Sequence, residues 1–226
     1  HLRACLHAPG PDARRGRHPH PAHHAKGRFA GRGGGGARGR HDDLDPRHQK
    51  SEEGVAAALQ QLDGSGGYRA LAALKDGGEI KAIGAGVNHV GMIPRFLERF
   101  EIDFFLVAMP YTLLEQEALD GELQLCEARG VSVVIGAPFA SGILARGPTP
   151  GALYRYAPAE ADILLKAQRI AAVCARHDVP LAAAALQFPF GHPSVVSIIP
   201  GPVATEEVRL NLGWMRRTVP SDLWAE

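Results

Sequence analysis

The sequence predicts an α/β fold in which helices cover a parallel sheet. Two observations lead to this fold class: short apolar runs alternate with amphipathic helical segments, and the runs are apolar almost without interruption, as in strands buried on both faces. These predicted strands lie at residues 79–88, 103–109, 131–139 and 195–201. Four strand–helix units correspond to half of an eight-unit (β/α)8 barrel of the TIM type, although the pattern alone also allows a flavodoxin-like open sheet.

The predicted helices follow from the helical spacing of apolar residues and from capping signals. Ser51 precedes two glutamates, a combination typical of a helix N-terminus. Gly78 and Gly130 follow helical patterns, as C-terminal glycines do. The helices are expected, in order, at 51–62, 67–78, 93–100, 113–130, 159–178, 181–188 and 205–217.

Residues 1–40 differ in composition from the rest, with nine Gly, nine Lys or Arg, six His and almost no aliphatic side chains. Such a segment cannot bury enough apolar surface to offset the entropy of ordering, so we expect a disordered basic segment ahead of a barrel region at 41–226. Its Arg/Gly pattern is typical of nucleic-acid-binding arms, and HPHPAHH at 18–24 is a candidate metal-binding patch. A plain solvated tail, or a GC-rich gene translated out of frame, would have the same composition.

Charge and cysteine content narrow the function classes. Residues 51–226 carry fourteen Lys or Arg against twenty Asp or Glu, which argues against nucleic-acid binding by the barrel region. No run approaches the ~18 apolar residues of a membrane span, so no membrane partner is expected. The three cysteines, Cys5, Cys126 and Cys174, are odd in number and far apart. They predict buried, reduced thiols in a cytoplasmic protein without a metal site.

Five motifs, taken together and in order, resemble the aldo-keto reductase family. In their residues the motifs are most similar to the branch that contains D-threo-aldose 1-dehydrogenase, L-fucose dehydrogenase and pyridoxal 4-dehydrogenase. The resemblance implies an incomplete (β/α)8 barrel with about strands four to eight present. The motifs are GVN (86–88), PYTLLEQEAL (110–119), GAPFASGIL (136–144), AAAALQFPFGHP (182–193) and SIIPG with EEVRLNL (197–212).

The resemblance implies an oxidoreductase that moves a hydride between NAD or NADP and a carbonyl or hemiacetal carbon of a small sugar or aldehyde. The cofactor would lie across the carboxyl ends of the strands, where barrel active sites are built. Asn88 would then hold the nicotinamide carboxamide, and the loop with Pro138, Phe139, Ser141 and Gly142 would wrap the pyrophosphate. A turn asparagine and an ordinary strand–helix loop remain the alternatives.

The same resemblance assigns the adenosine end of the cofactor to the last helix. Gly201 would lead into a helix that faces the adenosine phosphate, and Asn211 would contact adenine, unless it is simply a polar residue on an exposed helix face. No Lys or Arg lies between Gly201 and Glu207, and Glu207 can accept from a free ribose hydroxyl, so NAD is favoured over NADP. Tyr111 matches a position near the cofactor, or it is a packed aromatic.

The catalytic set that the resemblance implies is largely missing. His41 matches the histidine at the end of the fourth strand and is the candidate catalytic residue, although it could be one more His of a His-rich tail. None of the four tyrosines stands in the context of the family's proton-transferring Tyr, and the matching Asp and Lys are not found. We therefore expect a truncated or mis-framed enzyme that is weakly active or inactive. The alternatives are a non-catalytic remnant that binds a nucleotide or a partner, and a nucleic-acid-binding protein that uses residues 1–40.

Two further expectations concern surfaces. A barrel opened after four strands exposes unpaired strand edges, which favours association with another copy. The segment 145–158 reads as a long loop, and its Tyr154, Arg155 and Tyr156 are candidates to cover a sugar substrate.

Overall fold

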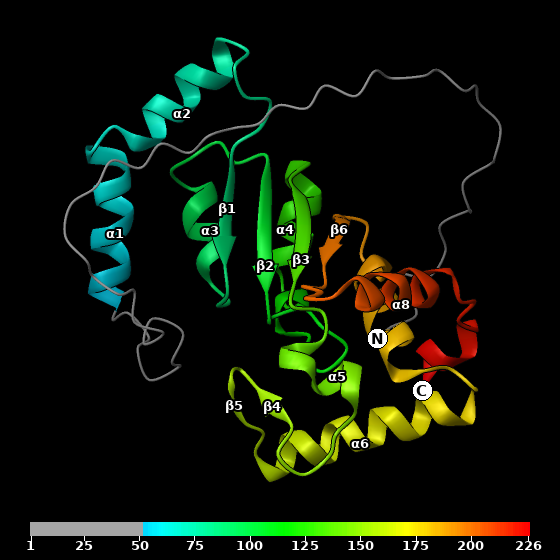
Figure 1. Ribbon diagram of the computed structural model, residues 1–226. Helices are drawn as coiled ribbons and strands as arrows, with labels where there is room; N and C mark the ends of the chain where they lie inside the picture. The colour runs from blue at the N-terminus through cyan, green and yellow to red at the C-terminus, as the bar shows by residue number, and fades with distance from the viewer. Residues whose placement is uncertain (1–51) are drawn as a thin grey trace, which may run out of the picture. The chain divides into compact units, whose positions relative to one another are not determined.

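The computed structural model describes residues 52–226, which fall within one compact unit (Figure 1). The predictions for the basic segment 1–40, for His41 and for Cys5 lie outside the described residues. The described cysteines, Cys126 and Cys174, are buried and free, as the sequence predicts.

A parallel four-stranded sheet forms the centre of the described chain. Its strands are β1 (Gly84–Val87), β2 (Phe104–Ala108), β3 (Ser132–Gly136) and β6 (Val195–Ile199), paired in that order. The four predicted strands are confirmed, although β1 is shorter than the predicted run 79–88. The strands follow one another in chain order without the reversal of a doubly wound sheet, which is the arrangement within a barrel wall.

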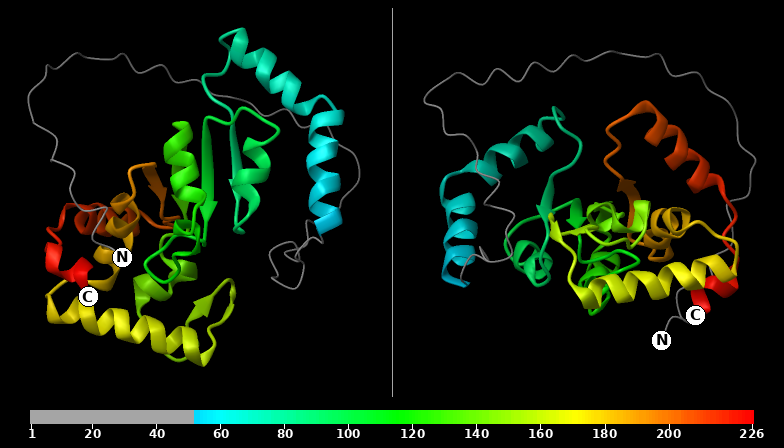
Figure 2. Two further views of the ribbon diagram at one scale, coloured as in Figure 1. Left: turned by 180° about the vertical axis from the view of Figure 1, so that it is seen from behind. Right: turned by 60° about the horizontal axis from the view of Figure 1, so that its bottom comes forward.

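Helices between the strands cover one face of this sheet. The side chains of Phe105, Val107, Val133 and Ile135 point to that face and are completely or almost completely buried. They form a core with residues of the helices that link the strands, among them Ile93, Leu123 and Cys126. Figure 2 shows these two helices, α3 and α4, on the same side of the strands. The α-helices are α1 (Glu52–Gly64), α2 (Gly67–Asp76), α3 (Met92–Leu97), α4 (Glu122–Arg129), α5 (Ile143–Arg146), α6 (Ala161–Arg176), α7 (Leu181–Gln187) and α8 (Thr205–Arg216).

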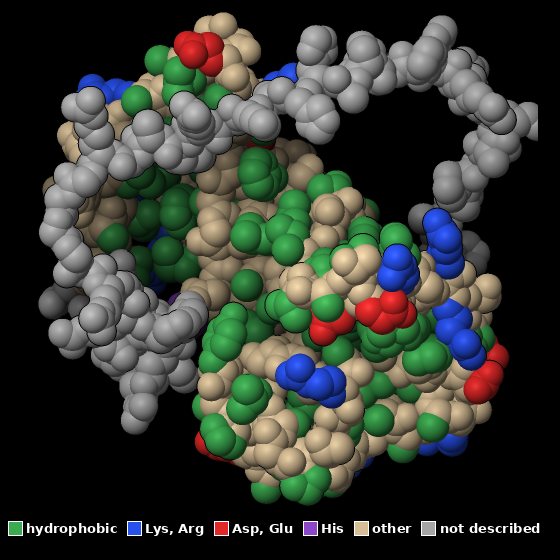
Figure 3. All heavy atoms as spheres, in the orientation of Figure 1, with side chains coloured by type: hydrophobic (Ala, Val, Ile, Leu, Met, Phe, Trp, Pro, Cys, Tyr) green, Lys and Arg blue, Asp and Glu red, His purple; other side chains and the backbone are tan. Residues whose placement is uncertain are grey.

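The opposite face of the sheet is open. Phe104 and Leu106 on β2 and Val134 on β3 are only half-buried there, and Ser197 on β6 is exposed. Figure 3 shows this region as apolar side chains and bare backbone, with charged side chains mostly at its surroundings. Gly84 is required here, because a Cβ at this position would lie 2.3 Å from the ring of Phe104 on the neighbouring strand.

The structure corrects two predicted elements. The predicted helix 113–130 is divided: residues 113–116 form a loop, a 3-10 turn η4 (Glu117–Leu119) follows, and α4 begins only after Gly121, whose φ is +119°. The hydroxyl of Thr112 accepts hydrogen bonds from the backbone N–H groups of residues 114 and 115 at 3.2 and 3.1 Å, which satisfies them outside a helix.

The predicted long loop 145–158 contains a short hairpin, β4 (Leu153–Tyr154) with β5 (Ala157–Pro158). Three 3-10 turns complete the structure: η5 (Ala140–Gly142), η6 (Phe188–Gly191) and η7 (Ser221–Ala225). Within residues 52–226, no helix combines the length and the apolar character that a membrane crossing needs.

Candidate functional site

The carboxyl ends of the four parallel strands bring the predicted site residues to one edge of the sheet. Asn88 follows β1, the segment 137–142 follows β3, and Gly201 follows β6. Because the strands are parallel and paired in register, these segments leave the sheet at the same edge. The fold therefore brings Asn88, the segment 137–142 and Gly201 to one edge of the sheet, where Tyr111 also follows the end of β2.

The segment 137–142 has an unusual backbone. Ala137, Ala140 and Ser141 have φ of +51°, +46° and +60°, and Gly142 has φ of +95°. Left-handed conformations cost non-glycine residues about 1–3 kcal/mol each and are concentrated at functional sites. The N–H groups of Ala140 and Gly142 donate to the carbonyls of Ala137 and Phe139, both at 2.9 Å, so the segment forms two successive tight turns.

This strained segment is held on both sides by packing. Pro138 is buried, and the ring of Phe139 contacts Trp214 of α8 edge-on, with centroids 6.1 Å apart. A Cβ at Gly142 would lie 2.6 Å from the guanidinium of Arg146, so both backbone conformation and space favour glycine there.

Two asparagine amides at this edge have no partner among the described residues. The side chain of Asn88 is exposed, and that of Asn211 on α8 is only 9% exposed. Neither side chain hydrogen-bonds to another of the residues 52–226. Solvent or a bound ligand therefore completes the hydrogen bonding of both amides, since no side-chain polar atom among residues 52–226 is both fully buried and without a partner. The alternative that Asn211 is a polar residue on an exposed helix face is wrong.

Glu207, in the first turn of α8, hydrogen-bonds back to the residues that precede the helix. One of its carboxylate oxygens accepts the backbone N–H of Val203 at 2.7 Å. Gly201, with φ of +67°, turns the chain from β6 into this region. Residues 201–207 contain no basic side chain. The first basic residue of α8 is Arg209, which pairs with Glu206 at 3.3 Å.

A cluster that the sequence did not indicate anchors the hairpin β4–β5 near this edge. The hydroxyl of Tyr154 donates to one carboxylate oxygen of Glu115, and Arg155 donates to the other at 3.0 Å and to the Tyr154 hydroxyl at 3.0 Å. Burial, reinforced by the hydrogen bond to Glu115, raises the pKa of Tyr154 to about 12. The partners are 39 and 40 residues apart, and Glu115 lay inside a predicted helix, so no local signal could identify them.

The cluster changes the role expected of the hairpin. Arg155 is engaged by Glu115 and is not free to face a sugar, whereas Tyr156 is 71% exposed. Arg155 and Tyr156 form the turn with φ of +48° and +64°, and the Tyr156 N–H donates to the hydroxyl of Ser141 at 3.3 Å. The hairpin is thus attached to the strained segment 137–142. Figure 1 shows it beyond the carboxyl ends of β2 and β3.

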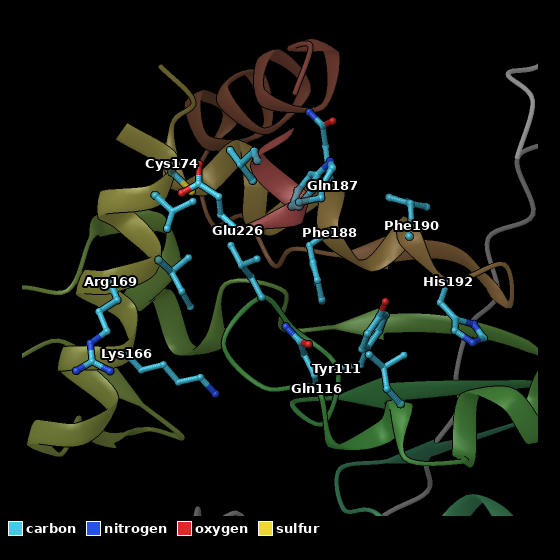
Figure 4. A pocket seen from close by; sticks show the side chains of 17 residues that line it. Tyr111, Gln116, Lys166, Arg169, Cys174, Gln187, Phe188, Phe190, His192 and Glu226 are labelled. Atoms are coloured by element: carbon cyan, nitrogen blue, oxygen red, sulfur yellow. The ribbon is translucent and has the colours of Figure 1, made fainter. Parts of the chain in front are cut away.

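Tyr111 follows β2, and its ring lies in a packed aromatic group. Its buried ring is 5.3 Å from that of Phe188 and 6.5 Å from that of His192. It borders a cavity of about 560 Å³ between α6, α7, η6, η7 and the segment 111–119 (Figure 4). Its position in the core agrees with the alternative of a packed aromatic, and its role toward a cofactor stays a prediction. His41 is outside the described residues.

Comparison with known proteins assigns the chain to a family. The sequence pattern of the aldo/keto reductase family matches residues 44–226, and the chain belongs to this family. Its fold is accordingly of the (β/α)8-barrel type, of which the described residues form a four-stranded part.

Individual relatives support the same assignment. The chain is 39% identical over 163 residues to a pyridoxal 4-dehydrogenase of Microbacterium luteolum, a match that covers 72% of this chain and 48% of the relative. It is 34% identical over 160 residues to a D-threo-aldose 1-dehydrogenase of Pseudomonas sp, covering 70% and 49%. The chain therefore spans about half the length of the curated relatives it matches.

Among solved structures, the holo form of aldo-keto reductase AKR11C1 from Bacillus halodurans is similar, with a TM-score of 0.55 and 26% identity. That match covers 69% of this chain and 51% of the solved chain.

Proposed function

We propose that the described residues form the cofactor-binding half of an oxidoreductase that acts on a small aldehyde or sugar with NAD as cofactor. The observation that carries this proposal is the grouping of Asn88, the strained segment 137–142 and Asn211 at the carboxyl edge of the sheet, where neither amide hydrogen-bonds to another of the residues 52–226. When bound, the nicotinamide supplies the hydride-accepting or hydride-donating carbon.

The residues present fit such a dinucleotide in three places. The Asn88 amide can both donate and accept, which matches the carboxamide of nicotinamide. The small residues of the segment 137–142 would let its backbone approach a pyrophosphate closely, and the Asn211 amide, which has no partner among the described residues, is available to a heteroaromatic base. These groups bind and orient the cofactor, while the proton-transferring residue is not among those assigned.

The choice of NAD over NADP rests on charge. Glu206 and Glu207 lie in the first turn of α8, and residues 201–207 offer no cation to a 2′-phosphate. Two carboxylates near that phosphate would repel it. The chain is also similar to an NADH-specific methylglyoxal reductase of Escherichia coli (strain K12), with 28% identity over 148 residues. The match covers 62% of this chain and 45% of the relative, and the cofactor named for that relative is in line with the choice of NAD.

The proposal is tested by titrating the full chain with NADH and NADPH in a calorimeter. NADH is expected to bind more tightly than NADPH, and Asn88→Ala is expected to weaken NADH binding about tenfold, since two neutral hydrogen bonds are lost. Gln168→Ala, an exposed amide on α6, is the control and should bind as wild type.

Tighter binding of NADPH would contradict the NAD assignment, and equal affinities of the Asn88 and Gln168 variants would contradict the site. NADH binding without turnover of pyridoxal, methylglyoxal or an aldose would restrict the protein to nucleotide binding.

We further propose that the open sheet associates with a second copy. Within residues 52–226 both β1 and β6 have one edge without a strand partner, and neither strand contains a charged residue or proline that would protect it. Val196 and Ile199 on β6 are 59% and 50% exposed.

Sedimentation velocity is expected to show species larger than the 24.1 kDa monomer as concentration rises. Ile199→Lys should weaken this association about tenfold or more, because a lysine on an edge strand disfavours pairing with another strand. Val203→Lys, at an exposed position outside the sheet, is the control. A wild-type chain that stays monomeric, or two variants with equal association, would refute the interface.

A further inference from the structure

The cavity beside Tyr111 has the dimensions and the wall of a small-molecule site. Its volume of about 560 Å³ lies within the range of ligand pockets, roughly 300–1,000 Å³. Apolar side chains from four regions of the chain form most of the wall, namely Leu113, Ile170, Val173, Phe188, Leu223 and Trp224. An occupant must therefore have a substantial apolar body.

Several polar side chains on the wall are already engaged. Glu226 pairs with Arg176 and with His177, the latter at 2.7 Å. The Gln187 amide donates to the carbonyls of Trp214 and Arg217 at 2.7 and 2.8 Å. These groups are committed to holding the C-terminal elements together and offer little to a ligand.

Two cations on α6 are different. Lys166 and Arg169 border the cavity one turn apart, and neither forms an ion pair or hydrogen bond with another residue of 52–226. Figure 4 shows Lys166 extending toward the side of the cavity where Gln116 lies. The side-chain carboxylate of Glu226, on the same wall, is paired with Arg176 and His177. The rim next to α6 is thus positively charged and the interior is apolar.

We propose that this cavity binds a small anionic amphiphile, a carboxylate with an apolar body. Its acid group pairs with Lys166 and Arg169 and accepts from the Gln116 amide, while its body fills the space between Ile170, Phe188 and Trp224. The site is separate from the proposed cofactor site, because of the residues assigned to that site only Tyr111 borders the cavity.

The chain offers a built-in reporter for this site. It contains two tryptophans, of which Trp224 lines the cavity and Trp214 contacts Phe139 instead. In a Trp214→Phe background the fluorescence of the full chain therefore reports on Trp224. Decanoate is the probe, and decan-1-ol is the uncharged probe with a chain of equal length.

Decanoate is expected to change the Trp224 emission saturably and to bind about tenfold more tightly than decan-1-ol, since two exposed cations contribute a modest charge interaction. Lys166→Ala with Arg169→Ala should remove this preference. Lys81→Ala with Arg216→Ala, which removes two exposed cations outside the cavity wall, should preserve it.

A third variant, Val173→Phe, narrows the cavity and should weaken binding of both probes while the thermal unfolding midpoint stays near that of the parent. Equal affinity for the two probes, or an unchanged preference in the variant that lacks Lys166 and Arg169, would overturn the anion site. Undiminished binding in Val173→Phe would overturn the cavity as the site. None of these results depends on NADH, so they are independent of the proposed cofactor role.

Discussion

Replacing Phe105 with alanine is expected to lower the free energy of unfolding by about 3–5 kcal/mol. Phe105 lies on the central strand β2, is 0% exposed, and contacts the ring of Phe96 edge-on with centroids 6.0 Å apart. The loss combines the transfer free energy of the ring with the cavity left between the sheet and its helices. Urea denaturation followed by circular dichroism measures it.

Phe190→Ala is the matched control, because it deletes the same side chain where the ring is 42% exposed. A cost of roughly 1 kcal/mol is expected there, in line with the smaller apolar area removed from contact. Equal losses for the two variants would show that the helix-covered face of the sheet is not the main core of this chain.

The second large effect concerns Glu122, the first residue of α4. Its buried carboxylate accepts hydrogen bonds from the backbone N–H groups of Gly91 at 2.8 Å and Ile93 at 3.2 Å, at the N-terminus of α3. Glu122→Ala leaves these two donors without a partner and should cost about 2–3 kcal/mol. Glu122→Gln keeps an acceptor oxygen and serves as the control.

The pH dependence separates the two roles of this carboxylate. Burial raises the pKa of Glu122 above its usual range, and the hydrogen bonds from Ile93 and Gly91 only partly oppose this. A raised pKa in the folded state contributes stability below the unfolded pKa of about 4.5, and that contribution is lost as pH rises through the folded pKa. Glu122→Gln, which cannot ionise, should therefore gain stability relative to wild type as pH rises above 4.5.

The measurement is the difference in unfolding free energy between wild type and Glu122→Gln from pH 4 to pH 8. Other titrating groups are common to both proteins and largely cancel. A difference that is constant with pH, or one that shifts in favour of the glutamate at higher pH, would show that the carboxylate is not destabilised by burial.

The candidate site places its strain where a ligand is expected. Ala140 and Ser141 adopt left-handed backbone, and the hairpin tied by Glu115 to Tyr154 and Arg155 is attached to this segment through Ser141. Strain of this kind persists only where surrounding packing enforces it. The contact of Phe139 with Trp214 supplies part of that packing.

The positions of the strands and of most helices, and the family, could be predicted from the sequence alone. The strands at 103–109 and 131–139 are apolar runs of a length and composition that only a buried strand satisfies, and helix 159–178 has a strong apolar periodicity. These signals are local: they depend on residues within one element and on its spacing. The order of motifs along the chain then indicated the aldo/keto reductase family, which the match over residues 44–226 confirms.

The contacts between residues far apart in the sequence could be seen only in the folded structure. The break before Gly121 depends on hydrogen bonds of Thr112 that compete with a helix, and the burial of Asn211 depends on packing across α8. Glu115 pairs with Arg155, 40 residues away, and the cavity beside Tyr111 is lined by four separate regions of the chain. Such contacts depend on how whole elements pack against one another. The periodicity and the propensity of a single segment therefore cannot predict them.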